Sequence, residues 1–175
     1  GELADISGIS QVCRRHGVLL LVDNAHGAYL RFLQPSRHPI DLGADLCCDS
    51  AHKTLPVLTG GAYLHIAKTA PKEFADHAKS AMALFGSTSP SYLILQSLDL
   101  CNACLAKGFK ESLALACYKT AQTRAVLRKQ GWQVEETDPL RITIKAPEGL
   151  TGQKLAEQLR QNRIECEYAD ADYLV

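Results

Sequence analysis

Hydrophobic positions in the first part of the chain follow two spacings, one typical of amphipathic helices and one of buried strands. Helical spacing joins Ile6, Ile9, Val12 and Cys13, and Gly17 predicts the end of that helix. The residues from Val18 to Val22 form a continuous apolar run of strand length, and we expect them to be buried on both faces of a parallel sheet.

Two further strands are predicted downstream. The apolar run from Ala44 to Asp49 follows a loop that contains Pro35 and Pro39, and it reads as a second short buried strand. A third strand is expected from Ala62 to Ala67. The connection before it is too short for a helical crossover, so we expect this strand to be antiparallel.

The remainder of the chain predicts helices and then a smaller mixed unit. Residues 68–83 are expected to be helical or irregular, and a long helix is expected over 91–130, beginning after Pro90 and broken near Gly108. After Gly131 the pattern predicts a strand, a strand, a helix capped by Thr151 and a strand, at 132–135, 140–145, 151–162 and 164–168.

The overall charge argues against nucleic acid and membranes as partners. The chain has 19 basic and 19 acidic residues, so no net charge attracts it to a polyanion. Its longest strongly apolar run is far shorter than the roughly 20 residues that a membrane span requires. We therefore expect neither nucleic-acid binding nor membrane insertion.

The cysteine pattern favours reduced thiols. Seven cysteines are an odd number, and no signal-peptide pattern precedes them, which favours a cytoplasmic protein. Cys101 and Cys104 form a CxxC without the second pair that a metal site needs, so we expect packing thiols and no metal. Cys47 and Cys48 are adjacent in a strand, so their side chains should face opposite sides.

Polar groups follow two consecutive predicted strands. Asp23 and His26 come after the first strand, and Ser50, His52 and Lys53 come after the second. Ligands of open α/β sheets bind beyond the carboxyl ends of the strands, so these groups are expected to converge. A generic doubly wound domain that binds some other phosphate ligand is one alternative. The chain contains neither GxGxxG nor GxxxxGK[ST], which argues against nucleotides as that ligand.

Three motifs together resemble a known family. Residues 22–27 read VDNAHG, residues 50–56 read SAHKTLP, and residues 87–92 read STSPSY. The combination resembles the fold-type I pyridoxal-phosphate enzymes and is most similar to the Orn/Lys/Arg decarboxylase family. This resemblance implies an α/β fold, with residues 1–110 as the later part of an aspartate aminotransferase-like large domain with a mainly parallel sheet. Residues 111–175 would form a linker helix and part of a smaller α+β domain.

The resemblance also implies roles for the two central groups. Lys53 would form a Schiff base with the cofactor aldehyde, which requires a neutral amine in a partly desolvated, electropositive pocket. Asp23 would face the pyridine nitrogen and favour its protonated form, so that the ring accepts the electrons left when a substrate bond breaks.

Four more residues would complete the cofactor contacts within one chain. By resemblance, Ser50 and His52 would lie near the phosphate, and His52 could also transfer a proton at the reacting carbon. Ala25 would pack on the ring. His26 would lie near the hydroxyl side of the cofactor, or it would fix the loop through hydrogen bonds.

The resemblance extends to assembly and substrate. Thr88 and Ser89 match a loop that reaches the phosphate of a neighbouring subunit's cofactor, which implies a homodimer or a higher oligomer of dimers. The implied reaction is decarboxylation of lysine, ornithine or arginine. Transamination and carbon–sulfur lysis use the same acid and lysine, so they stay open as alternatives.

A non-catalytic role also stays open. The family's phosphate-cradling loop and the aromatic residue that stacks on the ring belong upstream of the aspartate segment, so we expect this chain to be a piece with weak or no activity alone. Arg31 and Arg141 are candidates for binding the substrate carboxylate, although surface or packing roles are the expected ones.

Overall fold

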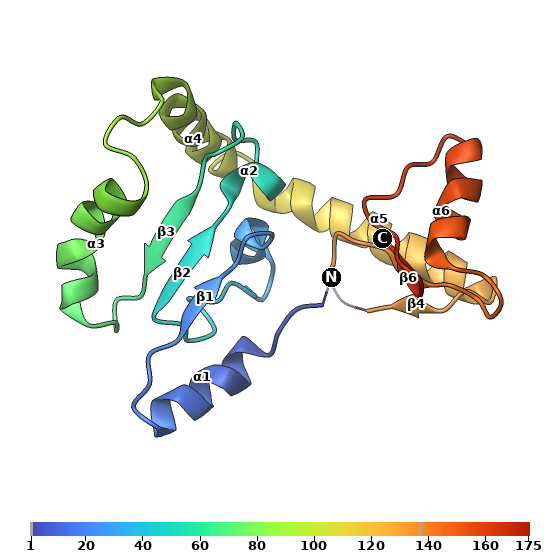
Figure 1. Ribbon diagram of the computed structural model, residues 1–175, viewed down its shortest axis with the longest axis horizontal. Coiled ribbons are helices and arrows are strands. Elements are labelled where there is room, and N and C mark those ends of the chain that lie inside the picture. Colours follow the sequence, from blue (N-terminus) through green and yellow to red (C-terminus); the bar gives the residue numbers. More distant parts are fainter. Residues whose placement is uncertain (1, 137) are drawn as a thin grey trace. The chain divides into compact units, whose positions relative to one another are not determined.

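The computed structural model describes residues 2–136 and 138–175, which fall into two compact units (Figure 1). The first unit is Asp5–Glu111, and the second is formed mainly by Ser112–Val175 together with the residues that precede Asp5. Among the described residues, no helix combines the length and apolar character needed to cross a membrane.

A three-stranded sheet forms the centre of the first unit. Its strands are β1 (Leu21–Asp23), β2 (Leu46–Asp49) and β3 (Tyr63–Ile66), in the order β1-β2-β3. The pair β1 and β2 is parallel, whereas β3 runs antiparallel to β2. The antiparallel direction predicted for the third strand is confirmed, and the parallel pair brings the carboxyl ends of β1 and β2 to one edge (Figure 1).

The first strand is shorter and more exposed than its sequence predicts. Pairing with β2 begins only at Leu20, whose carbonyl oxygen accepts the N–H groups of Asp45 and Leu46. Val18 is 57% exposed and Leu21 is 58% exposed, so burial on both faces is wrong for the described residues. The reason is that β1 makes its main contacts with β2, and no helix of the described residues packs extensively over its faces.

The amphipathic helix predicted around Ile6 to Cys13 is confirmed, whereas two short helices, over Ala28–Phe32 and Ala51–Thr54, were not predicted. Helix α1 (Ile6–Arg15) is capped by Asp5, whose carboxylate accepts the N–H of Gly8 at 2.9 Å, and a short 3-10 helix, η1, covers Ala28–Phe32. The remaining helices are α2 (Ala51–Thr54), α3 (Lys72–Phe85) and α4 (Tyr92–Leu105).

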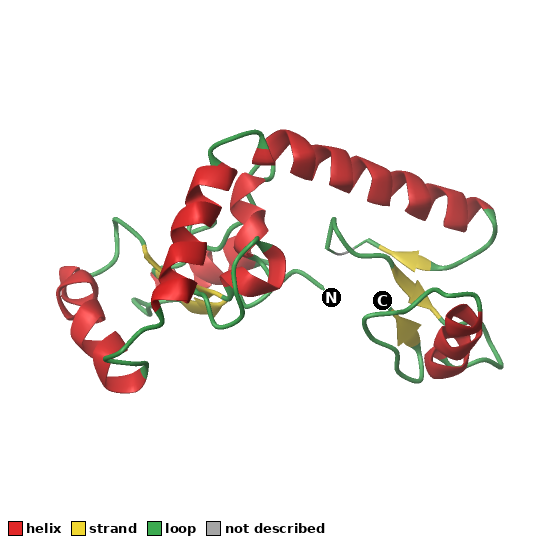
Figure 2. Ribbon diagram, turned by 90° about the horizontal axis from the view of Figure 1, so that it is seen from above, coloured by secondary structure: helices red, strands yellow, loops and turns green. Residues whose placement is uncertain are grey.

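Helix α5 (Phe109–Lys129) begins in the first unit and continues into the second. Gly108 lies between α4 and α5 with φ of 76°, a left-handed conformation that suits glycine. The break predicted near Gly108 is therefore confirmed, and both helices are visible in the two ribbon views (Figure 1, Figure 2).

Besides the continuing part of α5, the second unit contains a small antiparallel sheet packed with one further helix. Its strands β4 (Val134–Glu135), β5 (Thr143–Lys145) and β6 (Tyr173–Leu174) lie in that order, and α6 (Gly152–Gln161) contacts β6. The Thr151 hydroxyl accepts the N–H of Lys154 at 3.3 Å, which confirms the predicted helix cap.

The strand predicted at 164–168 is wrong. The strand that pairs with β5 is β6, which lies further along the chain. Residues 167–169 instead lie antiparallel to β6, with Ala169 bridged to Leu174. A tight turn joins the two segments, because the Asp170 carboxylate accepts the N–H groups of Asp172 and Tyr173. An apolar run alone did not reveal this turn.

Most buried apolar residues of the first unit lie on or next to η1, β2 and α2. They are Ala28, Tyr29, Leu30, Ala44, Cys47, Ala51 and Leu55. Cys47 is buried and Cys48 is exposed, so the two side chains do face opposite sides of the sheet. Cys101 is also buried, whereas Cys104 is exposed, so only one thiol of the CxxC packs inside.

Candidate functional site

The carboxyl ends of β1 and β2 lie next to each other in the parallel pair. Asp23 is opposite Cys48 in the register, and the N–H of Asn24 donates to the Cys48 carbonyl oxygen at 2.8 Å. Residues 23–26 therefore form one loop and residues 50–53 form a second, adjacent segment. Both begin where a strand ends, as expected for a ligand site in a sheet of this kind.

Lys53 and His26 connect these two segments. The ammonium Nζ of Lys53, on α2, lies 3.2 Å from Nε2 of His26. Both side chains are exposed, so the amine is open to a ligand. The partial desolvation expected of Lys53 is therefore not seen among the described residues. The neighbouring imidazole can still accept or donate a proton at the amine.

His52 has a defined tautomer. Its Nδ1 lies 3.1 Å from the carbonyl oxygen of Gly61, which can only accept, so Nδ1 carries a proton. The backbone N–H of His52 donates to the same oxygen at 3.2 Å. Nε2 is therefore the ring atom left for a ligand, as an acceptor when the ring is neutral and a donor when it is charged.

The remaining residues expected at this edge differ in exposure. Asp23 is exposed, while Ala25 and Ser50 are partly exposed. Ser50 occupies the cap position of α2, yet its hydroxyl makes no capping hydrogen bond. The two strand ends thus carry a carboxylate, a hydroxyl, two imidazoles and an amine, all with some access to solvent.

Thr88 and Ser89 lie elsewhere in the first unit, in the loop between α3 and α4. Both residues are exposed, and the N–H of Ser89 donates to the Ser87 hydroxyl at 3.0 Å. The loop therefore folds on itself, and its predicted role at a neighbouring subunit's cofactor stays a prediction.

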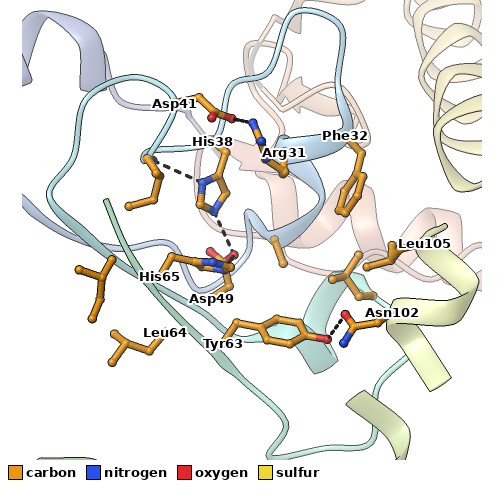
Figure 3. A pocket seen from close by; sticks show the side chains of 14 residues that line it. Arg31, Phe32, His38, Asp41, Asp49, Tyr63, Leu64, His65, Asn102 and Leu105 are labelled. Atoms are coloured by element: carbon orange, nitrogen blue, oxygen red, sulfur yellow. Dashed lines mark hydrogen bonds and ion pairs between the residues drawn. The ribbon is translucent and has the colours of Figure 1, made fainter. Parts of the chain in front are cut away.

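A buried acid directly behind the site was not identified from the sequence. Asp49, the last residue of β2, is only 3% exposed. Its Oδ2 accepts from Nε2 of His38 at 3.0 Å and from Nε2 of His65 at 2.9 Å (Figure 3). Its Oδ1 accepts from Nδ2 of Asn24 at 2.7 Å. We call Asp49, His38, His65 and Asn24 the Asp49 network.

Electrostatics of the Asp49 network favour an ionised carboxylate. Burial by itself would raise the pKa of Asp49, but hydrogen bonds from His38, His65 and Asn24 outweigh it and hold the pKa well below its ordinary value. The neighbouring Cys47 responds in the opposite sense. Burial and the Asp49 charge raise the pKa of its thiol, so Cys47 stays protonated and donates to Oδ1 of Asp49 at 3.6 Å.

The composition of the Asp49 network also raises the question of a metal. The ligand atoms of His38, Asp49 and His65 lie within 4.8 Å of one another, and two histidines with one carboxylate are a common metal-binding set. However, Nδ1 of His38 accepts the N–H of Ile40 at 3.3 Å, so the ring proton belongs on Nε2. If a metal were bound at Nε2 of His38, the ring proton would move to Nδ1 and face the Ile40 N–H, which is also a donor. The geometry therefore favours a hydrogen bond from Nε2 of His38 to Asp49 over a metal at that atom.

A cavity of about 490 Å³ adjoins the Asp49 network (Figure 3). Tyr63 lines it and donates to Oδ1 of Asn102 at 3.1 Å, and burial raises the pKa of Tyr63 to about 12. Arg31 also lines the cavity and pairs with Asp41. In the second unit, Arg141 pairs with Glu167 at 3.3 Å. Both arginines considered for a substrate carboxylate therefore have acidic partners within the chain.

A signal for the Asp49 network is present in the sequence but incomplete. Asp49 and His65 are polar residues within apolar strand patterns, and a buried acid requires partners. Which side chains supply the hydrogen bonds depends on how distant segments meet, and the strand pattern carries no information about that.

Comparison with known proteins covers nearly the whole chain. Residues 1–161 match the family described as Orn/Lys/Arg decarboxylase, major domain. An arginine decarboxylase of Bacillus subtilis is 30% identical over 97% of this chain, and one of Bacillus anthracis is 28% identical over 97%. The uncharacterized protein YaaO of Bacillus subtilis is 30% identical over 100% of it. The chain spans 37% of each arginine decarboxylase and 38% of YaaO.

Solved structures share the fold. An aspartate aminotransferase from Thermus thermophilus matches with a TM-score of 0.73 and 14% identity, over 99% of this chain and 54% of that chain. A ureidoglycine-glyoxylate aminotransferase from Bacillus subtilis matches with a TM-score of 0.71 and 15% identity, over 99% and 51%. The predicted fold class, that of the fold-type I, aspartate aminotransferase-like proteins, is confirmed.

Proposed function

Because this chain belongs to the Orn/Lys/Arg decarboxylase family, we propose that it carries the lysine and the ring-nitrogen acid of a pyridoxal-phosphate-dependent decarboxylase. The observation that carries the proposal is the exposed Lys53 amine, which lies 3.2 Å from His26 at the carboxyl edge of a parallel strand pair that also presents Asp23. The substrate class is a basic amino acid, namely lysine, ornithine or arginine.

The groups at this edge fit the cofactor chemically. Asp23 is an exposed carboxylate suited to a protonated ring nitrogen, and the small Ala25 side chain leaves room for a flat ring. When bound, the cofactor supplies an electron sink for the bond that breaks at the substrate's alpha carbon. The protein's part is to hold the ring and to supply and remove protons.

Ser50 and His52 are suited to the phosphate. The Ser50 hydroxyl is not used to cap α2, and the Gly61 carbonyl orients the His52 ring so that Nε2 is available. A phosphate dianion favours the protonated imidazole, which would then donate from Nε2. His26, beside the Lys53 amine, is placed to accept or return a proton at Nζ.

Assembly and location are part of the same proposal. Thr88 and Ser89 would contact the cofactor phosphate of a neighbouring subunit, so the complete site would need a homodimer or a higher oligomer of dimers. A cytoplasmic location is also proposed, because the seven cysteines are an odd number and no signal-peptide pattern precedes them.

The proposal is tested by trapping the lysine–cofactor bond. Purified protein is incubated with pyridoxal phosphate, reduced with borohydride and mapped by mass spectrometry. A pyridoxyl group on Lys53 is expected, together with its loss in Lys53→Ala and its retention in Lys68→Ala, a matched change at an exposed lysine. Any carbon dioxide release from lysine, ornithine or arginine then identifies the substrate, and weak or no release is expected of this chain alone. Absence of any adduct, or an adduct only on other lysines, would contradict the proposal.

A further inference from the structure

Asn24 is the middle of the Asp23–Ala25 segment, and it is held at three of its atoms. Its Nδ2 donates to Oδ1 of Asp49 at 2.7 Å, its N–H donates to the Cys48 carbonyl at 2.8 Å, and its carbonyl accepts from Gly27 at 2.9 Å. The side chain also lies close against Gly27, where an added Cβ would come within 2.0 Å of Oδ1 of Asn24. The Asn24 side chain is therefore enclosed between Asp49 and the Gly27 backbone.

Asp49 is equally constrained from the other side. His38 and His65 both donate to Oδ2, and the tautomer of His38 is set by Ile40, so its Nε2 proton points at the carboxylate. These contacts keep Asp49 ionised and orient it, which leaves Oδ1 directed at Asn24. The groups around the carboxylate are His38, His65, Asn24 and the Cys47 thiol.

Asp49 also joins the two halves of the site. Its backbone leads directly into Ser50, His52 and Lys53, while its side chain holds Asn24 and hence the loop that carries Asp23 and His26. We infer that Asp49 is a positioning residue that couples these two segments, so that the ring-nitrogen acid and the lysine face one cofactor. This inference rests on the proposed function and assigns Asp49 a role that it exerts through Asn24 and through the backbone that leads to Lys53.

A matched control lies at the other end of the same strand pair. Oδ2 of Asp45 accepts the N–H of Leu20 at 2.8 Å, so Asp45 also joins β1 to β2 but far from the cofactor edge. Asp45→Asn and Asp49→Asn remove the same charge with the same change of shape. Only the second should disturb the loop at 23–26.

The first measurement is backbone hydrogen exchange of residues 23–27 without cofactor. Asp49→Asn is expected to speed exchange of this loop at least roughly ten-fold, because an amide cannot accept from His38, His65 and Asn24 together, whereas Asp45→Asn leaves it unchanged. If Asp49→Asn fails to fold, Asn24→Ala removes the same link while leaving both histidines on Asp49. Unchanged exchange in the folded variant, or an equal change in Asp45→Asn, would overturn the inference.

The second measurement is cofactor binding by titration of the long-wavelength absorption band. Asp49→Asn is expected to weaken affinity roughly ten-fold or more and to change the circular dichroism of that band, which reports ring orientation. Asn24→Ala should give a similar loss, and the double variant no further loss. Additive losses, or affinity and dichroism like those of the wild type, would contradict positioning through Asn24.

The two proposals fail separately. If the wild-type protein shows no borohydride-trapped adduct on Lys53, the proposed function is wrong, while the exchange measurement still decides whether Asp49 holds the loop. If the adduct forms and Asp49→Asn behaves like Asp45→Asn, only the positioning role is wrong.

Discussion

Asp49 in the first unit and Arg124 in the second are both buried charges, but their partners differ in kind. Asp49 accepts from side chains of three separate segments, at Asn24, His38 and His65. Arg124, on α5, donates from Nε to the Arg141 carbonyl at 3.0 Å and also to the Asp138 carbonyl. The side-chain partners of Asp49 come from separate segments, whereas the carbonyl partners of Arg124 fasten one loop to helix α5.

Sheet topology explains why this difference arises. The parallel pair of β1 and β2 places two strand ends and the loops after them at one edge, so polar side chains from distant segments meet there. The strands β4, β5 and β6 alternate in direction, so the carboxyl ends of neighbouring strands lie at opposite ends of the sheet. The second unit therefore has no comparable collection of loops after parallel strands among its described residues.

The largest loss of stability is expected when the Asp49 network is removed. Asp49→Ala should lower the free energy of unfolding by about 4 kcal/mol, because it leaves His38, His65 and Asn24 without their shared acceptor. Urea unfolding followed by far-ultraviolet circular dichroism measures the loss. Asp45→Ala removes a single N–H partner and should cost about 1 kcal/mol, and equal losses in the two variants would contradict a special role for Asp49.

The second effect concerns the other buried charge. Arg124→Ala should cost about 3 kcal/mol, because the Asp138 and Arg141 carbonyls lose their buried donor. The fluorescence of Trp132, the single tryptophan, follows unfolding of the second unit. Arg128→Ala, one turn further along α5 at a more exposed arginine, is the control and should cost less. Unchanged adduct formation on Lys53 in Arg124→Ala would show that Arg124, unlike Asp49, does not act on the proposed site.

The third prediction concerns the pH dependence of stability that an ionised Asp49 causes. The pKa of Asp49 is lower in the folded protein than its ordinary value of about 4. The ionised carboxylate therefore contributes fully to the free energy of unfolding above about pH 4, and this contribution is lost as the pH falls toward the folded pKa. The free energy of unfolding of the wild type should exceed that of Asp49→Asn at neutral pH. This difference should decrease by about 2 kcal/mol between neutral pH and pH values well below 4. Unfolding curves across this range test it, and a difference that is constant or widens in acid would count against an ionised Asp49.

The smallest effect probes a local contact in the second unit. Thr151→Ala removes the acceptor for the Lys154 N–H at the start of α6 and should cost about 1 kcal/mol. Thr151→Ser keeps the hydroxyl and should cost much less. Trp132 fluorescence during urea unfolding compares the variants, and a loss in Thr151→Ala no greater than in Thr151→Ser would show that the cap contributes little.

Local features of the fold were predictable from the sequence alone. The Thr151 cap and the break at Gly108 depend on residues close in the chain, and the structure contains both. The placement of Asp23 and Lys53 after consecutive strands was also predictable, because strand ends are marked by the change from apolar to polar residues. Their roles toward a cofactor remain proposals.

Features that depend on which segments meet were decided only by the tertiary structure. Leu21 is exposed because no helix of the described residues packs extensively over β1. The strand that pairs with β5 is β6 rather than the one predicted at 164–168, because the chain turns at Asp170. The partners of Asp49 lie 25, 11 and 16 residues away along the chain. Hydrophobic periodicity reports which face of an element is buried, but a buried acid's hydrogen-bond partners are selected by folding, which brings distant side chains within about 3 Å.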